Sequence, residues 1–262
     1  MPKPSSRNGD PARLTLPRAG PSLRPARRGK SMTDQNSRNR EHAVAIRYQQ
    51  RSAEVGALQR QCYALATLRL RDAVKVNGGG EGLAVVSDID ETILDNTAIM
   101  AHVMAEGHDF TDISHWKRWE REGEPGLIPG AVDFFTLADR LGVTIFYVSD
   151  RFDENKFATI ATLSRLGLPQ VVADQVMLFG PPKAERRAAI ASRFRIILQL
   201  GDTLHDFDGA FAGQSLENQH RLAADHADRF GEDWIVFPNA AHGTWLQADL
   251  RPWQLPLTAD RI

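Results

Sequence analysis

Short apolar runs alternate with longer segments of helical spacing along this chain. Five runs rich in β-branched and aromatic residues predict strands over 83–87, 143–148, 175–179, 195–200 and 234–237. Segments with apolar residues at helical spacing precede and separate these runs, over 41–75, 131–141, 154–166, 183–193 and 216–229. Strands that alternate with helices in this way predict an α/β fold built on a doubly wound parallel sheet.

The connection between the first two runs, about residues 97–142, is too long for a simple crossover. We interpret residues 97–128 as a small helical cap inserted into the fold. The cap carries Trp116 and Trp119, three residues apart on a predicted helix. They either pack as the core of the cap or form an aromatic wall facing a substrate. Packing is the commoner use of aromatic residues at this spacing.

Charge is distributed unevenly along the 262 residues. Residues 1–31 carry eight Lys or Arg against one acid, Asp10, whereas the remainder has a net charge of −8. A segment so basic and so poor in large apolar residues cannot offset the entropy cost of ordering, so we expect a disordered basic tail, placed at residues 1–38. Residues 39–262 suffice for one sizeable domain. The acidic charge of that domain argues against a nucleic acid polymer as partner.

Cysteine content and hydropathy bear on where the protein acts. Cys62 is the only cysteine, and no apolar run approaches the ~20 residues that a membrane span requires. A signal peptide is not visible either, because no apolar segment follows the basic residues near the amino terminus. We therefore expect a cytoplasmic protein without a membrane partner.

Four groups of chemically active side chains accompany the predicted strands and helices. In chain order they are a carboxylate pair, a hydroxyl, an ammonium group and a second carboxylate pair, namely Asp88 with Asp90, Ser149, Lys183, and Asp202 with Asp206. The carboxyl ends of parallel strands meet at one edge of a sheet, where α/β folds bind their ligands. A carboxylate pair can supply both a nucleophile and a proton donor. An acidic surface turn is the favoured explanation of a single Asp-x-Asp pair, so it is the series of four that indicates an active site.

Two signatures within this series resemble those of a known family. Residues 86–96 read VSDIDETILDN and residues 201–207 read GDTLHDF. Both are similar to motifs of the haloacid dehalogenase superfamily, and more narrowly of its subfamily IIIB, the class C acid phosphatases. That group includes bacterial lipoprotein acid phosphatases and 5'-nucleotidases. The likeness extends over about residues 45–245 and implies a haloacid dehalogenase-like, Rossmannoid fold with Mg²⁺ as cofactor.

The resemblance also implies roles for individual side chains. Asp88 would be the nucleophile that forms a phosphoaspartate, and Asp90 the general acid and base. Ser149 would hydrogen-bond a phosphoryl oxygen, and Lys183 would balance the remaining phosphate charge.

The metal ligands implied for Mg²⁺ are the Asp88 carboxylate, the backbone carbonyl of Asp90 and the carboxylate of Asp202. Asp206 would orient the lysine or the metal-bound waters. Thr92, in the first signature, is a further supporting residue.

The chain departs from the family pattern at two substrate-facing positions. Ile99 stands where the family usually has an aromatic residue after the first signature, which should weaken stacking of a nucleobase. Asp150 follows Ser149 where the family usually has Asn. Its negative charge should weaken anion binding unless Arg151 neutralises it.

The function that the resemblance implies is a Mg²⁺-dependent acid phosphatase acting on small phosphomonoesters, with nucleoside monophosphates among the candidate substrates. One alternative is a sugar-phosphate or other metabolite phosphatase of the same fold. A non-catalytic storage or binding relative is a third interpretation. The retention of the expected site residues argues against it, namely Asp88, Asp90, Ser149, Lys183 and Asp202. The expected partners are a small phosphomonoester and, if the chain is not monomeric, a second copy in a homodimer.

Overall fold

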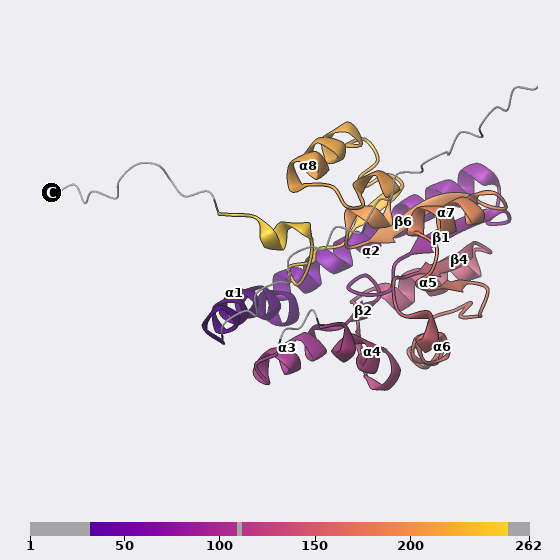
Figure 1. The fold of residues 1–262 in the computed structure, drawn as a ribbon. Coiled ribbons are helices and arrows are strands. Elements are labelled where there is room, and N and C mark those ends of the chain that lie inside the picture. Colours follow the sequence, from indigo (N-terminus) through magenta and orange to yellow (C-terminus); the bar gives the residue numbers. More distant parts are fainter. Residues whose placement is uncertain (1–31, 109–111, 251–262) are drawn as a thin grey trace, which may run out of the picture.

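The computed structural model describes residues 32–108 and 112–250 (Figure 1). The α-helices are α1 (Met32–Arg51), α2 (Ala53–Asn77), α3 (Thr97–Ala105), α4 (Ile113–Glu122), α5 (Ala131–Arg140), α6 (Lys156–Arg165), α7 (Lys183–Ala191) and α8 (Leu216–Asp225). The strands are β1 (Leu83–Ser87), β2 (Leu94–Asp95), β3 (Gly126–Leu127), β4 (Thr144–Val148), β5 (Val176–Met177), β6 (Arg195–Gly201) and β7 (Trp234–Val236).

Five strands form a parallel sheet in the order β5-β4-β1-β6-β7. β1 lies in the centre, and all five of its residues are buried because helices cover both faces of the sheet. This arrangement confirms the predicted α/β fold with a doubly wound parallel sheet. Each of the five predicted strands is present, although β5 is limited to two residues at the edge of the sheet.

Alternate residues of the strands divide the core between the two faces of the sheet. Val85 packs in a large cluster with side chains of α2 and α5, including Leu70 and Phe134. Its neighbour Val86 packs on the opposite face with Ile190 of α7. The carboxyl end of β1 is thereby held between two packed layers, and the turn that follows it starts from a fixed position.

The segment predicted as a cap, 97–128, contains α3, α4 and the short strand β3. β3 pairs antiparallel with β2, so a two-stranded ribbon joins the ends of this segment to the domain. The sequence did not predict this ribbon, because two-residue strands carry no detectable alternation. In Figure 1, α3 lies beside α1 and α4 follows next to α3, and Ile46 of α1 packs against Met100 and Val103 of α3.

The amino-terminal helical segment differs from its prediction at two points. It consists of α1 and α2 rather than one helix, since Ser52 has extended backbone geometry and accepts hydrogen bonds from the first turn of α2. α1 begins at Met32, so its first seven residues overlap the segment that was predicted as a tail. Their polar composition hides the helix from an analysis of apolar spacing. Residues 1–31 lie outside the described part of the chain.

No helix within residues 32–108 and 112–250 combines the length and the apolar character needed to cross a bilayer. The long helix α2, for example, contains charged residues throughout its 25 positions.

Candidate active site

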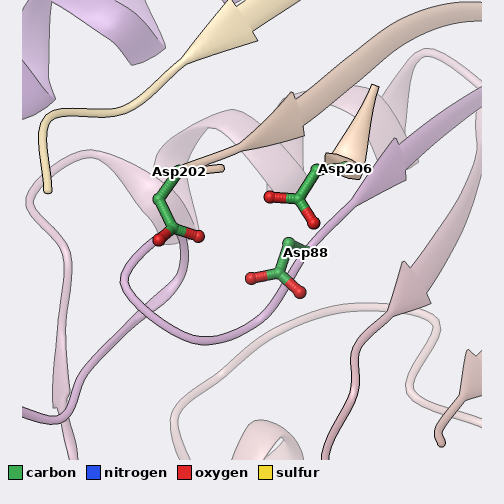
Figure 2. A group of neighbouring side chains, drawn as sticks. All are labelled: Asp88, Asp202 and Asp206. Atoms are coloured by element: carbon green, nitrogen blue, oxygen red, sulfur yellow. The ribbon is translucent and has the colours of Figure 1, made fainter. Parts of the chain in front are cut away.

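The first carboxylate pair follows β1 directly and is aligned with the end of β6. Ser87 of β1 pairs with Leu200 of β6, and the Asp88 backbone N–H donates to the Leu200 carbonyl at 2.9 Å. Asp202 comes immediately after β6. Figure 2 shows the carboxylates of Asp88, Asp202 and Asp206 turned toward one another at the ends of these two strands, and their ligating oxygens lie within 4.8 Å of one another. The structure therefore brings together residues more than one hundred positions apart.

Asp206 returns to this cluster because the chain turns back tightly after Gly201. A Cβ on Gly201 would lie 2.4 Å from the Cβ of Asp206, so the close approach excludes any side chain there. One carboxylate oxygen of Asp206 accepts hydrogen bonds from the N–H and the hydroxyl of Thr203, at 2.9 and 2.7 Å. These bonds leave the other oxygen facing Asp88.

Lys183, the first residue of α7, contacts one carboxylate that follows β1 and one that follows β6. Its Nζ donates to Asp88 Oδ1 and to Asp206 Oδ1, each at 2.6 Å, and the lysine side chain is only 8% exposed. Burial lowers the pKa of Lys183, but the two carboxylates raise it more, and the ammonium form is stable. The pKa of Asp88 is raised well above its usual range by burial, which Lys183 opposes and Asp206 reinforces.

Asp90 faces away from this cluster, toward Arg151 and Asn96. Arg151 Nη2 donates to Asp90 Oδ1 at 2.7 Å, and Arg151 Nε lies 3.0 Å from both carboxylate oxygens. Asn96 Nδ2 donates to the same Oδ1 at 2.9 Å. Burial raises the pKa of Asp90, but the charge of Arg151 and the hydrogen bonds from Arg151, Asn96 and Ser149 together lower it more, so the net shift is downward.

Ser149 lies between Asp90 and the loop that follows β4. Its hydroxyl donates to Asp90 Oδ2 at 3.2 Å and accepts the Arg151 N–H at 3.1 Å. Thr92 lies behind the turn: it is fully buried, and its carbonyl accepts the Tyr63 hydroxyl at 2.7 Å. The Thr92 hydroxyl has no hydrogen-bond partner among the described residues.

These side chains line a cavity of about 380 Å³. Its base is formed by Asp88, Asp90, Ser149, Lys183 and Asp202, and the apolar side chains of its wall are Ile113, Trp116 and Phe152. Trp116 lies on the cavity wall and also packs against the α1–α3 contact, whereas Trp119 is not among the lining residues. Ile99 packs in that same α1–α3 contact.

A sequence model of the HAD superfamily, subfamily IIIB (Acid phosphatase), matches residues 28–245. The chain belongs to this family. The phosphatase is also similar to two structures of the class C acid phosphatase from Bacillus anthracis. The first has 33% identity and a TM-score of 0.75 over 79% of this chain and 87% of that one. The second, with tungstate bound, has the same identity and TM-score over 80% and 88%. These likenesses confirm the predicted superfamily and identify the protein as a phosphomonoesterase.

The acidic cluster has the chemistry of a site for a divalent metal ion. Asp88, Asp202 and Asp206 present carboxylate oxygens, which hard divalent cations prefer. Asp88 and Asp206 share the ammonium of Lys183. Burial raises the pKa of Asp202 to about 7, against a smaller lowering by His242. Burial thus disfavours the ionised form of Asp88 and Asp202, and a bound cation would favour it. The side chain of Asp90 is not part of the cluster.

Several residues of the site were not among the predicted ones. His242, for which the sequence predicted no role in the site, lies 3.1 Å from the buried Glu91 carboxylate and 3.9 Å from Asp202. Burial lowers the pKa of His242, but the hydrogen bond and charge of Glu91 raise it more, to about 9. Glu91 and Asn96 lie inside the first signature, so the motif itself could have indicated them as site residues. Nothing in the sequence links Glu91 to a histidine 151 positions later.

The charge of Asp150 is neutralised, but not by Arg151. Arg186 of α7 forms the ion pair with Asp150 at 2.5 Å and also donates to the Ser149 carbonyl at 2.7 Å. Arg151 is instead committed to Asp90. The neutralising partner of Asp150 is therefore Arg186, which is 36 residues away in the sequence.

Proposed function

We propose that this phosphatase hydrolyses small phosphomonoesters, nucleoside monophosphates among them, through an aspartyl-phosphate on Asp88 and with Mg²⁺ as its metal. The observation that carries the proposal is the contrast between Asp88 and Asp90. Asp88 contacts Lys183 in the acidic cluster, whereas Asp90 contacts Arg151, Asn96 and Ser149 across the cavity. Two carboxylates in one pocket with different partners suit two different roles.

In the first half-reaction a carboxylate oxygen of Asp88 attacks phosphorus, and the bond between phosphorus and the ester oxygen breaks. The departing oxygen takes the proton of the Asp90 carboxyl group, so an alcohol leaves and an acyl phosphate remains on Asp88. Because Arg151 holds the pKa of Asp90 low against the effect of burial, the protonated form is most populated in acidic solution.

In the second half-reaction a water molecule attacks the phosphorus of the acyl phosphate. Its proton passes to the Asp90 carboxylate, the bond between phosphorus and the Asp88 oxygen breaks, and inorganic phosphate leaves. Both carboxyl groups return to their starting states. The ion pair with Arg151 favours the ionised Asp90 that this step requires.

Asp88 and Asp202 would hold the Mg²⁺ ion, together with the backbone carbonyl of Asp90, and Asp206 lies in the same cluster. When bound, the ion supplies positive charge that offsets the charges of nucleophile and phosphate. Asp206 keeps Lys183 in place through its 2.6 Å ion pair.

Ser149 and Lys183 would bind the phosphoryl oxygens. An ammonium group has three N–H donors, and Lys183 uses two of them on Asp88 and Asp206, which leaves one for a phosphoryl oxygen. The Ser149 hydroxyl would move its hydrogen bond from Asp90 to phosphate. The Bacillus anthracis relative with tungstate bound supports oxyanion binding in this family, since tungstate is a tetrahedral oxyanion like phosphate.

The cavity wall bears on the choice of leaving group. Ile99 occupies a position that is usually aromatic in the family, but it packs on the cluster at the α1–α3 contact, whereas Trp116 and Phe152 line the cavity. An aromatic wall of this kind supports nucleoside monophosphates over sugar phosphates, since base stacking contributes about 1–3 kcal/mol. A sugar-phosphate or other metabolite phosphatase remains the alternative. A non-catalytic storage role is not supported, because each proposed catalytic side chain lies in the cavity.

A phosphomonoester screen with and without Mg²⁺, across acidic to neutral pH, tests the proposal. We expect phosphate release that requires Mg²⁺, and trapping of phosphate on Asp88, detectable by mass spectrometry after rapid acid quenching. The kcat/KM ratio between a nucleoside monophosphate and a small alkyl phosphate measures the contribution of the aromatic wall. Release in excess chelator would contradict the metal assignment, and a ratio near one would favour the metabolite alternative. The homodimer and the cytoplasmic location stay predictions.

A further inference from the structure

The cap helix α4 contacts the immediate surroundings of Asp90 through two consecutive residues. The first is Trp119, whose indole Nε1 donates to Asn96 Oδ1 at 2.8 Å. Asn96 in turn donates from Nδ2 to Asp90 Oδ1 at 2.9 Å, and it is fully buried. An amide side chain can present either its oxygen or its nitrogen in a given direction. Because an N–H donor holds the oxygen of Asn96, its NH₂ group is directed to Asp90.

The second residue is Glu120, which is also buried. Its Oε2 accepts the Phe152 backbone N–H at 3.0 Å and Asn155 Nδ2 at 2.9 Å. Phe152 follows Arg151 directly, so Glu120 fixes the backbone next to the arginine that pairs with Asp90. Of the three side chains that donate to the Asp90 carboxylate, Asn96 and Arg151 are thus tied to the same turn of α4, and Ser149 is the third.

Asp90 depends on such ties because it lies in a turn beyond β1. Its side chain is 22% exposed, compared with 7% for Asp88. Water therefore has access to this carboxylate, and a carboxylate that transfers a proton must be held within hydrogen-bond reach of the leaving oxygen. The cap restrains the Asp90 carboxylate through Asn96 and Arg151.

We propose that α4 positions Asp90 for proton transfer, with Trp119 and Glu120 as positioning residues that act through Asn96 and Arg151. This inference rests on the proposed role of Asp90 as general acid. It assigns to the cap a part in the chemistry in addition to its place on the cavity wall. Trp119 fulfils this role without lining the described cavity.

The test compares two substrates whose leaving groups differ in their need for a proton. A nitrophenyl phosphate releases nitrophenolate, a stable anion that needs little protonation, whereas an alkyl phosphate releases an alkoxide, which must be protonated by the acid. Trp119→Phe removes the N–H and keeps an aromatic ring. We expect it to lower kcat/KM for the alkyl phosphate by about fivefold, the factor for one ordinary hydrogen bond, and for the nitrophenyl phosphate by less than about twofold.

Glu120 provides a second pair of variants. Glu120→Gln retains an oxygen acceptor and should behave like the parent, whereas Glu120→Ala should show the same selective loss as Trp119→Phe. Arg118→Gln is the matched control on α4, since Arg118 is exposed and pairs only with Glu122 in the described structure. We expect it to leave both substrates unaffected.

Asp90→Asn, assayed in parallel, distinguishes failure of the positioning role of α4 from failure of the general-acid role of Asp90. A selective loss with the alkyl phosphate for Asp90→Asn, but none for Trp119→Phe and Glu120→Ala, would overturn the positioning role and leave the proposed function standing. An equal loss on both substrates in the α4 variants would show a structural role only, and would also overturn it. If Asp90→Asn lowered kcat/KM equally for the two substrates, the general-acid role itself would be contradicted, and the positioning role with it.

Discussion

The two sides of the cavity hold their carboxylates in different ways. On the domain side, Asp88 extends from the central strand and contacts Lys183, and its partners come from α7 and from the end of β6. On the cap side, Asp90 lies in the following turn, and its partners come from the loop after β4 and from Asn96, which α4 holds in place. Asp88 is 7% exposed and Asp90 22%.

This difference shows how two carboxylates of one short signature can be held by different kinds of contact. The domain side is part of the packed sheet, so the position of Asp88 is determined by the same contacts that stabilise the fold. The cap side is built from hydrogen bonds between segments far apart in the sequence. We therefore expect changes on the domain side to affect activity and stability strongly, and changes on the cap side to be smaller and more selective.

The largest effect should come from Asp88→Asn. The amide has the shape of the carboxylate but is a poor nucleophile, so phosphate release should fall by orders of magnitude. Asp90→Asn should lose less, about 10²- to 10⁴-fold, the usual contribution of general acid–base catalysis. Steady-state phosphate release and thermal unfolding of both variants check this order. Substantial activity in Asp88→Asn would contradict its assignment as nucleophile.

Lys183→Met tests the stability of the domain side. Removing the ammonium leaves Asp88 and Asp206 buried without their cation, and breaking a buried pair in this way costs about 3–5 kcal/mol. Chemical denaturation in the presence of a chelator measures this loss. Lys75→Met, at an exposed position, is the control. An unchanged unfolding free energy would show that the carboxylates do not depend on Lys183.

Asp202→Ala tests whether the domain side depends on the metal more than the cap side does. The substitution removes a proposed Mg²⁺ ligand. Loss of a residue that only supports a metal ligand usually weakens metal binding by about 10- to 100-fold. Because Asp202 would bind the ion directly, the Mg²⁺ concentration for half-maximal activity should rise by about 100-fold. Trp119→Phe, on the cap side, should leave that concentration unchanged. A parallel rise in both variants would mean that the two sides are not separable.

The smallest effect concerns the pH dependence of the cap contact. Burial raises the pKa of Glu120 from 4.5 to about 6, against the lowering by its hydrogen bond from Asn155. The folded protein thus binds a proton that the unfolded chain releases between pH 4.5 and 6, and the parent loses stability as the pH rises through this window. Relative to Glu120→Gln, the loss should reach about 2 kcal/mol above pH 6.

Denaturation of parent and Glu120→Gln at several pH values measures this difference. Glu124→Gln, at an exposed position, controls for the loss of a surface carboxylate. A difference that stays constant across the window would show that Glu120 is already ionised in the folded protein at low pH.

Local patterns in the sequence determined the central part of the fold. Each strand of the sheet is an apolar run bounded by turn residues, and Asp88, Ser149, Lys183 and Asp202 stand beside these runs. Once the sheet is parallel, its geometry alone places them at one edge. This is why the cavity could be predicted from short segments. The residues 32–38 and the break at Ser52 were not predictable in this way, because polar helices and caps leave no apolar periodicity.

Only the tertiary structure decided the partners of these residues. Asp150 pairs with Arg186 rather than with the adjacent Arg151, Glu91 meets His242 from the last part of the described chain, and Trp119 reaches Asn96 from the cap. Each of these contacts joins segments that are separated by loops whose paths depend on packing. Side-chain charge and hydrogen-bonding capacity are properties of single residues, but which donor meets which acceptor is set by the three-dimensional arrangement of the chain.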